Sequence, residues 1–144
     1  MLKVLLVDDE PFIVQGLSGL IDWEKEGFEI VGTAGNGSEA VEFLKSNPVD
    51  LILADIKMPV MNGLVFLKYI RETHLSEAFF VILSGYGDFT YAKEAIKWQC
   101  TDYILKPIQK SQLLALLSKV KQMQQDKKEE SERIRQIGKA YFVQ

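Results

Sequence analysis

The stretch Leu2-Lys3-Val4-Leu5-Leu6-Val7-Asp8-Asp9 decides the fold, because an apolar run ends there in two adjacent acids. A short run rich in Val and Leu is typical of a strand that is buried on both faces. Two neighbouring carboxylates repel each other and need a cation close by. The stretch therefore predicts a buried strand whose carboxyl end belongs to a charged site.

Further apolar runs along the chain end in the same way, with a polar residue directly after the last apolar one. A run at residues 28–34 differs, since Glu29 within it indicates a strand at an exposed edge of the sheet. The other three runs are residues 51–54 before Asp55, residues 79–83 before Ser84, and residues 103–105 before Lys106.

Amphipathic segments separate the apolar runs and predict five helices. The first begins at Glu10-Pro11 with an apolar stripe of Ile13, Leu17, Leu20 and Ile21, the second begins at Asn36 with Glu39 in a capping pattern, and the third begins after Met61-Asn62-Gly63. The fourth begins near Asp88 and is expected to bury Phe89, Ala92, Ala95 and Ile96. The fifth begins after Pro107 and runs through Leu113, Leu117 and Val120. Strict alternation of strands and helices predicts an α/β fold with a parallel sheet and right-handed crossovers.

Ligands of such sheets bind outside the carboxyl ends of the strands, where the strand order reverses. Asp8, Asp9, Asp55, Ser84 and Lys106 all follow strand ends. We therefore expect these five side chains to meet at one edge of the sheet.

This set of side chains suits a divalent metal and a phosphoryl group. The Asp55 carboxylate can act as a nucleophile and become an acyl phosphate. Asp9 and Asp55 could bind Mg²⁺ directly and Asp8 through water, since Mg²⁺ keeps several waters. Lys106 and the Ser84 hydroxyl could hold phosphoryl oxygens.

Each residue alone has an ordinary explanation. Ser84 could cap the next turn, Lys106 could be a solvated surface charge, and Asp8-Asp9 could sit at a helix start because the helix dipole favours acids there. Their combination at corresponding strand ends is what favours the phosphoryl site.

Composition limits the remaining possibilities. The chain has 144 residues, 47% hydrophobic and 26% charged residues, and a net charge of −3, which is typical of one globular domain. The sequence has no cluster of basic residues, so we expect no nucleic-acid contact by this chain itself. The single Cys100 predicts no disulfide, and neither a signal peptide nor a membrane span is expected. We expect a cytoplasmic protein.

Four motifs together resemble the receiver domain of bacterial two-component response regulators. They are Val7-Asp8-Asp9-Glu10, Asp55-Ile56-Lys57-Met58-Pro59 with Asn62-Gly63, Ser84-Gly85, and Lys106-Pro107. The resemblance covers about residues 1–123 and implies a flavodoxin-like (βα)5 three-layer sandwich, with a parallel five-stranded sheet in the order 2-1-3-4-5.

The resemblance also implies a role for each matching residue. Asp55 would take a phosphoryl group from a sensor histidine kinase, and Asp8 and Asp9 would bind Mg²⁺ together with Asp55 and the Lys57 backbone carbonyl. Ser84 and Tyr103 would be the switch residues and Lys106 the phosphate-binding lysine. The Lys106-Pro107 peptide bond would be cis.

Residues 83–95, LSGYGDFTYAKEA, are similar to receivers joined to AraC-type helix-turn-helix output domains. The predicted organisation is a receiver over residues 1–123 and a helical extension over residues 124–144 toward an output domain outside this sequence, with transcription control as the output. DNA contact would come through that output domain.

The extension carries a heptad spacing. It runs through Leu116, Val120, Met123, Lys127, Glu130, Ile134 and Ile137, with Gly138 expected to end the helix. A solvated linker is the favoured interpretation, and a coiled coil requires a partner chain. A homodimer could form through this helix or through the face made by the fourth helix, the fifth strand and the fifth helix.

Three other functions remain open. An aspartyl-phosphate phosphatase would usually carry a second Asp two residues after the nucleophile, where this chain has Lys57. A flavin-binding module would need a phosphate loop after the first strand, and Asp8-Asp9-Glu10 would repel phosphate there. A stand-alone phosphorylation-dependent interaction module would share the receiver site without controlling transcription.

Overall fold

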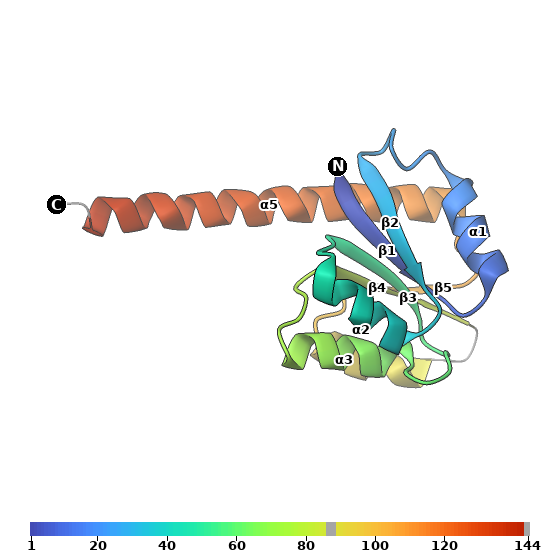
Figure 1. The fold of residues 1–144 in the computed structure, drawn as a ribbon. Helices are drawn as coiled ribbons and strands as arrows, with labels where there is room; N and C mark the ends of the chain where they lie inside the picture. The colour runs from blue at the N-terminus through green and yellow to red at the C-terminus, as the bar shows by residue number, and fades with distance from the viewer. Residues whose placement is uncertain (86–88, 143–144) are drawn as a thin grey trace. The chain divides into compact units, whose positions relative to one another are not determined.

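The computed structural model describes residues 1–85 and 89–142, without the side chains of Phe89 and of residues 140–142. The chain divides into two units, Met1–Lys110 and Ser111–Gln144, and each is described by itself. The first unit contains a five-stranded parallel sheet in the order β2-β1-β3-β4-β5 (Figure 1). The predicted fold class and strand order are thus confirmed.

All strands of this sheet run in the same direction, so their carboxyl ends lie along one edge. The order reverses between β1 and β3, because the chain passes from β1 outward to β2 and then returns to the other side of β1. The strands are β1 (Leu2–Val7), β2 (Phe28–Ala34), β3 (Leu51–Asp55), β4 (Phe79–Ser84) and β5 (Asp102–Leu105).

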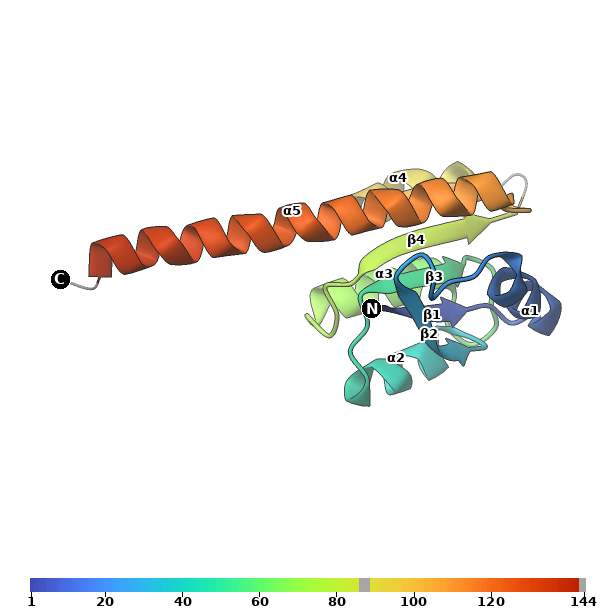
Figure 2. The same ribbon diagram turned by 90° about the horizontal axis from the view of Figure 1, so that it is seen from above.

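Helices cover both faces of the sheet, with α2 and α3 on one side and α1 on the other (Figures 1 and 2). On the α2 and α3 side, Leu5, Ile52 and Phe80 of the strands pack in one buried cluster with Phe66 of α3. The elements of this unit are α1 (Pro11–Leu20), α2 (Gly37–Ser46), α3 (Gly63–Glu72), the 3-10 turn η1 (Phe89–Tyr91) and α4 (Ala92–Lys97).

Side-chain caps determine where α2 and α3 begin. Asn36 Oδ1 accepts from the Glu39 backbone N–H at 2.9 Å, and Glu39 Oε2 accepts from the Gly35 N–H at 2.7 Å. Asn62 Oδ1 accepts from the Val65 N–H at 2.8 Å. These bonds satisfy backbone donors that have no partner within the helix, so the predicted start of α2 at Asn36 is confirmed.

The expected burial in the fourth helix is wrong at one position. Ala95 is fully buried, but Ile96 is 73% exposed. Helix α4 has only six residues, and neighbouring residues of a helix point about 100° apart, so a helix this short buries a narrow stripe. The predicted cap Asp88 and the side chain of Phe89, which was also expected to be buried, lie outside the described residues.

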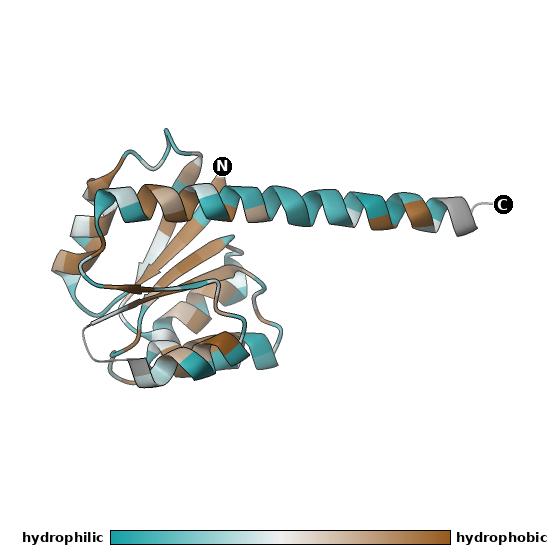
Figure 3. Cartoon of the chain, turned by 180° about the vertical axis from the view of Figure 1, so that it is seen from behind, coloured by the Kyte–Doolittle hydropathy of each residue, from teal (hydrophilic) through white to brown (hydrophobic). Residues whose placement is uncertain are grey.

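The second unit consists mainly of α5 (Lys110–Phe142), which continues through Gly138 instead of ending there. One glycine inside a helix costs only about 1 kcal/mol relative to alanine, and strong helix formers flank it. Leu113, Leu116, Leu117 and Val120 are buried, whereas later residues are mostly polar and exposed (Figure 3). Over the described residues, no helix is long and apolar enough to cross a membrane.

Candidate functional site

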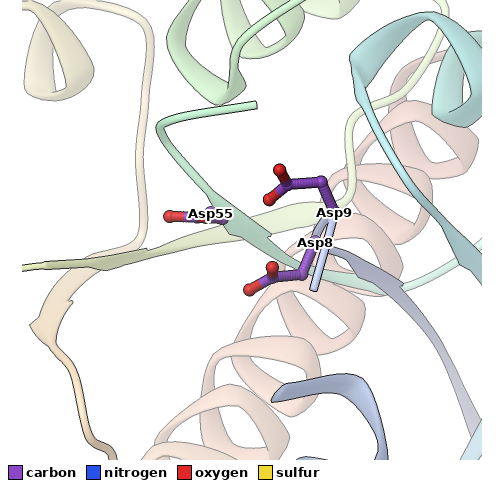
Figure 4. Close-up of side chains that lie close together, drawn as sticks. All are labelled: Asp8, Asp9 and Asp55. Atoms are coloured by element: carbon purple, nitrogen blue, oxygen red, sulfur yellow. The ribbon is translucent and has the colours of Figure 1, made fainter. Parts of the chain in front are cut away.

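Three carboxylates gather at the point where the strand order reverses. Asp8 and Asp9 follow β1, and Asp55 ends the neighbouring strand β3 (Figure 4). One carboxylate oxygen from each lies within 4.8 Å of the others. Asp8 and Asp55 are buried, while Asp9 is exposed. The expected meeting of these three acids is therefore present in the fold.

Lys106 supplies positive charge to this acid cluster from the end of β5. Its Nζ lies 2.8 Å from Asp8 Oδ2 and 3.3 Å from Asp55 Oδ2. The backbone N–H of Lys106 donates to the Ser84 carbonyl at 2.7 Å, which holds the β5 end against β4. Burial alone would lower the pKa of Lys106, but its bond to Asp8 and the charge of Asp55 raise it overall.

The environment of Asp55 favours its neutral form. Burial raises the pKa of this carboxyl, Lys106 opposes the rise, and the charge of Asp8 adds to it. The backbone N–H of Ile56 donates to Asp55 Oδ1 at 2.8 Å. The second oxygen, Oδ2, is the one that faces Lys106. A carboxylate held in this way keeps one oxygen directed at the cation site.

Ser84, at the end of β4, and Tyr103, within the neighbouring strand β5, form a second group. Tyr103 donates its hydroxyl to Ser84 Oγ at 3.1 Å, and Ser84 Oγ donates to the Gly85 carbonyl at 3.0 Å. Ser84 is fully buried. The two expected switch residues are thus in direct contact, and Lys106 connects them to the acid cluster through the Ser84 carbonyl.

The remaining predicted residues lie in the two loops beside the acids. The Lys106-Pro107 peptide bond is cis, the isomer expected from the resemblance. Lys57 follows Asp55 by two residues in the loop between β3 and α3, and its side chain is exposed. Its backbone carbonyl remains the group predicted to contact a metal.

Gly63 belongs to the Asn62-Gly63 motif, but its role as a positioning residue was not predicted from the sequence. A Cβ atom at this position would lie 2.0 Å from the Asp55 carbonyl oxygen. The Gly63 N–H also donates to the Ile56 carbonyl at 2.8 Å. The start of α3 therefore packs directly on the backbone of Asp55. The signal in the sequence was its place in the Asn62-Gly63 motif, at a predicted helix start.

A tight turn completes the same loop. Val60 has φ 67°, and the Met61 N–H donates to the Pro59 carbonyl at 2.7 Å, which makes a three-residue γ-turn. Positive φ is a costly conformation for a β-branched residue. The Met61 carbonyl accepts from the Gly37 N–H at 2.9 Å, so contact with the start of α2 holds the turn in place.

An apolar pocket of about 440 Å³ adjoins the acid cluster, since Lys106 lines both. One wall is the exposed side of α1 and the other is the segment after β5. Phe12 at its rim is 85% exposed. The lining residues from α1 include Phe12, Ile13 and Leu20, and those from the other wall include Pro107 and Ile108.

The residues present fit a hard divalent cation. Clustered carboxylate oxygens are the ligands that Mg²⁺ and similar ions prefer. Asp8 and Asp55 are buried beside the Lys106 ammonium, and a divalent cation would offset the repulsion among the three carboxylates. Asp8, Asp9 and Asp55 would hold such an ion.

The fold and the site together define a class: a flavodoxin-like domain with an acid and lysine site at the switch point of its sheet. The chain belongs to the response regulator receiver domain family, whose profile matches residues 4–118.

Sequence relatives agree with this family. The chain is 40% identical over 120 residues to the uncharacterized transcriptional regulatory protein YesN of Bacillus subtilis, which covers 83% of this chain and 32% of the relative. It is 37% identical to the transcriptional regulatory protein HptR of Staphylococcus aureus, covering 83% of this chain and 46% of the relative. The chain thus spans a third to a half of the length of these relatives.

Solved structures agree as well. The receiver domain of AraT, a response regulator from Geobacillus stearothermophilus, is 38% identical with a TM-score of 0.81, and the match covers 88% of this chain and 98% of that one. A two component transcriptional regulator AraC from Clostridium phytofermentans is 31% identical with a TM-score of 0.75, covering 85% and 94%.

Proposed function

We propose that this chain receives a phosphoryl group on Asp55 and changes conformation in response. The observation that carries the proposal is the meeting of Asp8, Asp9, Asp55 and Lys106 at the switch point of the sheet. Phosphoryl transfer depends mainly on positioning and on neutralising charge. A nucleophilic carboxylate beside a cation site and an ammonium supplies both.

In the proposed reaction, a carboxylate oxygen of Asp55 attacks the phosphorus of a phosphorylated histidine. The P–N bond breaks, its electron pair returns to the imidazole, and the new P–O bond makes an acyl phosphate. Oδ2 is the better placed oxygen, because Oδ1 is bonded to the Ile56 N–H while Oδ2 faces Lys106.

The neighbouring residues would prepare this step. Asp8, Asp9, Asp55 and the Lys57 carbonyl would hold Mg²⁺, which when bound offsets negative charge on the transferred group. Lys106 would exchange its contact with Asp8 for a phosphoryl oxygen. This exchange requires only a small movement of the lysine side chain, because the Lys106 ammonium already lies 3.3 Å from Asp55 Oδ2.

Ser84 and Tyr103 would convert phosphorylation into a structural change. A phosphoryl oxygen is a stronger hydrogen-bond acceptor than the Gly85 carbonyl, to which Ser84 now donates. Turning the Ser84 hydroxyl toward the phosphoryl group would alter its bond with Tyr103 and the position of the segment after β4. The loop, α4 and β5 would then present a changed surface to a partner.

Beryllofluoride, a phosphoryl mimic, tests this proposal directly. With Mg²⁺ present, we expect amide signals between residues 84 and 106 to shift, because the mimic engages Ser84 and Lys106. Beryllofluoride without a divalent metal is the matched control and should produce little change. An unchanged spectrum with metal present would remove the switch from the proposal.

We propose further that the chain acts only on itself, through phosphorylation and dephosphorylation of Asp55. A phosphatase of this type would need a general acid near the acyl phosphate, whereas the residue two positions on is the exposed Lys57. Steady-state turnover of an outside phosphate ester would contradict this assignment.

The phosphodonor would be a sensor histidine kinase that docks on the apolar pocket beside Lys106. Phe12, at the rim, is the most exposed large apolar side chain of α1 and would be its anchor. We expect Phe12→Ala to slow transfer from the kinase about 10-fold, in line with loss of an interface hot spot.

Acetyl phosphate is a small phosphodonor that needs no protein docking, so it distinguishes a docking defect of Phe12→Ala from a defect in phosphoryl transfer. Phe12→Ala should react with acetyl phosphate at the normal rate, since Phe12 lines the apolar pocket and is not among the residues proposed to hold the metal or the phosphoryl group. Val65→Ala, which shortens an exposed apolar side chain on α3, is the matched control and should transfer normally from the kinase. Equal slowing with both donors would place Phe12 in the site itself.

The whole protein would be a cytoplasmic transcription regulator, by analogy with the regulators that this chain resembles. Residues 124–144 would lead to its output domain. A homodimer would form through α5, where Ile134 is 61% and Ile137 51% exposed at heptad spacing. A molar mass that does not rise with concentration in sedimentation equilibrium would exclude this dimer for the isolated chain.

A further inference from the structure

Arg71 in the last turn of α3 makes an unusual set of contacts. Its guanidinium donates to carbonyls of two loops instead of sitting in solvent. In the loop before β4, it reaches the Ser76 carbonyl at 2.9 Å and the Ala78 carbonyl at 2.8 Å. In the loop before β5, it reaches the Trp98 carbonyl at 3.3 Å and the Gln99 carbonyl at 3.2 Å. One side chain thus joins α3 to the C-terminal end of α4.

The segment that Arg71 holds is bonded on its other sides too. The Cys100 N–H donates to the Ala95 carbonyl at 3.0 Å, which closes the end of α4. Thr101 is paired with β4 in both directions, since its N–H donates to the Phe80 carbonyl at 2.7 Å and its Oγ1 accepts from the Phe80 N–H at 3.1 Å. Residues 98–101, here called the α4 anchor, are therefore attached to three elements.

The backbone of the anchor includes a residue with positive φ. Gln99 has φ 64°, a conformation that is unfavourable for a residue with a side chain. Its carbonyl is one of the four that accept from Arg71. Left-handed residues after a helix end are commonly held by local backbone bonds, and here the guanidinium adds a bond from α3 to the same residue.

At its opposite end, α4 is packed by the partly buried Tyr91 against the core cluster, and the described residues give it no side-chain cap. Its first residue follows Tyr91, which makes no side-chain cap, and the turn before it is 3-10. Ala95 is the single buried residue among the six of the helix. Within α4 itself, the buried side chain is thus Ala95, while the C-terminal end of the helix is held by hydrogen bonds.

The chain order places this asymmetric helix between the two switch residues. Ser84 precedes α4, the anchor follows it, and Tyr103 lies two residues beyond the anchor. With its C-terminal end held, the helix can respond to a change at Ser84 by rotating about that end. Without that restraint, the same change would displace the anchor and the start of β5 as well.

We propose that Arg71 is a positioning residue that makes the α4 anchor a fixed pivot, so that phosphorylation moves α4 while residues 98–101 stay in place. The inference rests on the proposed function, because it describes how the movement caused by phosphorylation is limited to α4.

Amide spectra with and without beryllofluoride and Mg²⁺ test the pivot. In the unmodified chain we expect residues 91–97 to shift and residues 98–101 to keep their positions. In Arg71→Met, which keeps the stem and removes the donors, we expect the shifts to extend through residue 101. We also expect beryllofluoride affinity to change at least threefold, while the initial rate with acetyl phosphate stays normal.

Two further variants keep the test decisive. Arg71→Lys retains one donor group and should restrict the shifts partly, even if Arg71→Met folds poorly. Arg133→Met removes an exposed arginine of α5 and should behave like the unmodified chain.

The outcomes separate the two proposals. No response of the unmodified chain to beryllofluoride means that the proposed switch fails. A response in which residues 98–101 shift as much as residues 91–97, or in which the Arg71 variants match the unmodified chain, overturns the pivot alone.

Discussion

Replacing Asp55 with asparagine is expected to abolish phosphorylation by acetyl phosphate, with a loss of at least roughly 100-fold, because an amide is no nucleophile at this site. The side chain keeps its size and its bond from the Ile56 N–H, so the fold should persist. Incorporation of labelled phosphate measures the effect. Asp22→Asn, in an exposed loop, should leave incorporation intact.

Full incorporation in Asp55→Asn would move the phosphorylation site elsewhere. Partial incorporation at Asp8 or Asp9 would be visible by peptide mass, and it would mean that the acid cluster accepts the group without selecting Asp55. Neither result would alter the fold or the family of the chain.

The same variant should change how stability depends on pH. Burial raises the pKa of Asp55 in the folded chain, so the folded state binds this proton more tightly than the unfolded state does. Its stabilising contribution is present at low pH and is lost as pH rises through the raised pKa. Near neutral pH the ionised carboxylate therefore costs stability.

Asp55→Asn removes that cost. In metal-free buffer we expect a higher melting temperature than for the unmodified chain at neutral pH, with the difference shrinking as pH falls below the raised pKa. Thermal melts across the acidic range measure it. A difference that grows toward low pH would contradict the sign of the Asp55 shift.

Gly63→Ala is expected to have the largest effect on stability. The added Cβ would lie 2.0 Å from the Asp55 carbonyl oxygen and 2.9 Å from its carbonyl carbon. Both are backbone atoms that cannot turn aside as a side chain can. We expect a loss of about 3 kcal/mol, at the upper end for overpacking, measured by urea unfolding.

The clash should also displace Asp55, so residual folded protein should be phosphorylated poorly. Gly19→Ala is the matched control, because nothing lies within 4 Å of a Cβ at that helical position. Helix propensity predicts that it stabilises the chain by up to about 1 kcal/mol. Equal stability of Gly63→Ala and Gly19→Ala would mean that the close packing of α3 on β3 is not required.

Much of the fold was predictable because it depends on local patterns. Fully apolar runs indicated buried parallel strands, and Asn36 with Glu39 indicated the start of α2. The failures occurred where local pattern gives little information. Ile96 follows the buried Ala95 in sequence, yet its exposure depends on how short α4 is. Gly138 is a helix breaker by propensity, yet α5 continues through it.

The site divides in the same way. The order of residues along the chain already placed Asp8, Asp9, Asp55, Ser84 and Lys106 at strand ends, because parallel strands bring their carboxyl ends to one edge. Distances between side chains do not follow from that order. The contact of Lys106 with both Asp8 and Asp55, and the bond between Tyr103 and Ser84, come from the packing of neighbouring strands.

The sequence by itself determined which residues can carry the chemistry and which end of the sheet they share, since strand period and alternation are local properties. Only the tertiary structure decided what surrounds them. Gly63 packs on the backbone of Asp55, and Arg71 bonds to two carbonyls at the end of α4 and to two in the loop before β4. Such contacts join segments far apart in the chain, and their geometry depends on how whole elements pack rather than on the residues at either end.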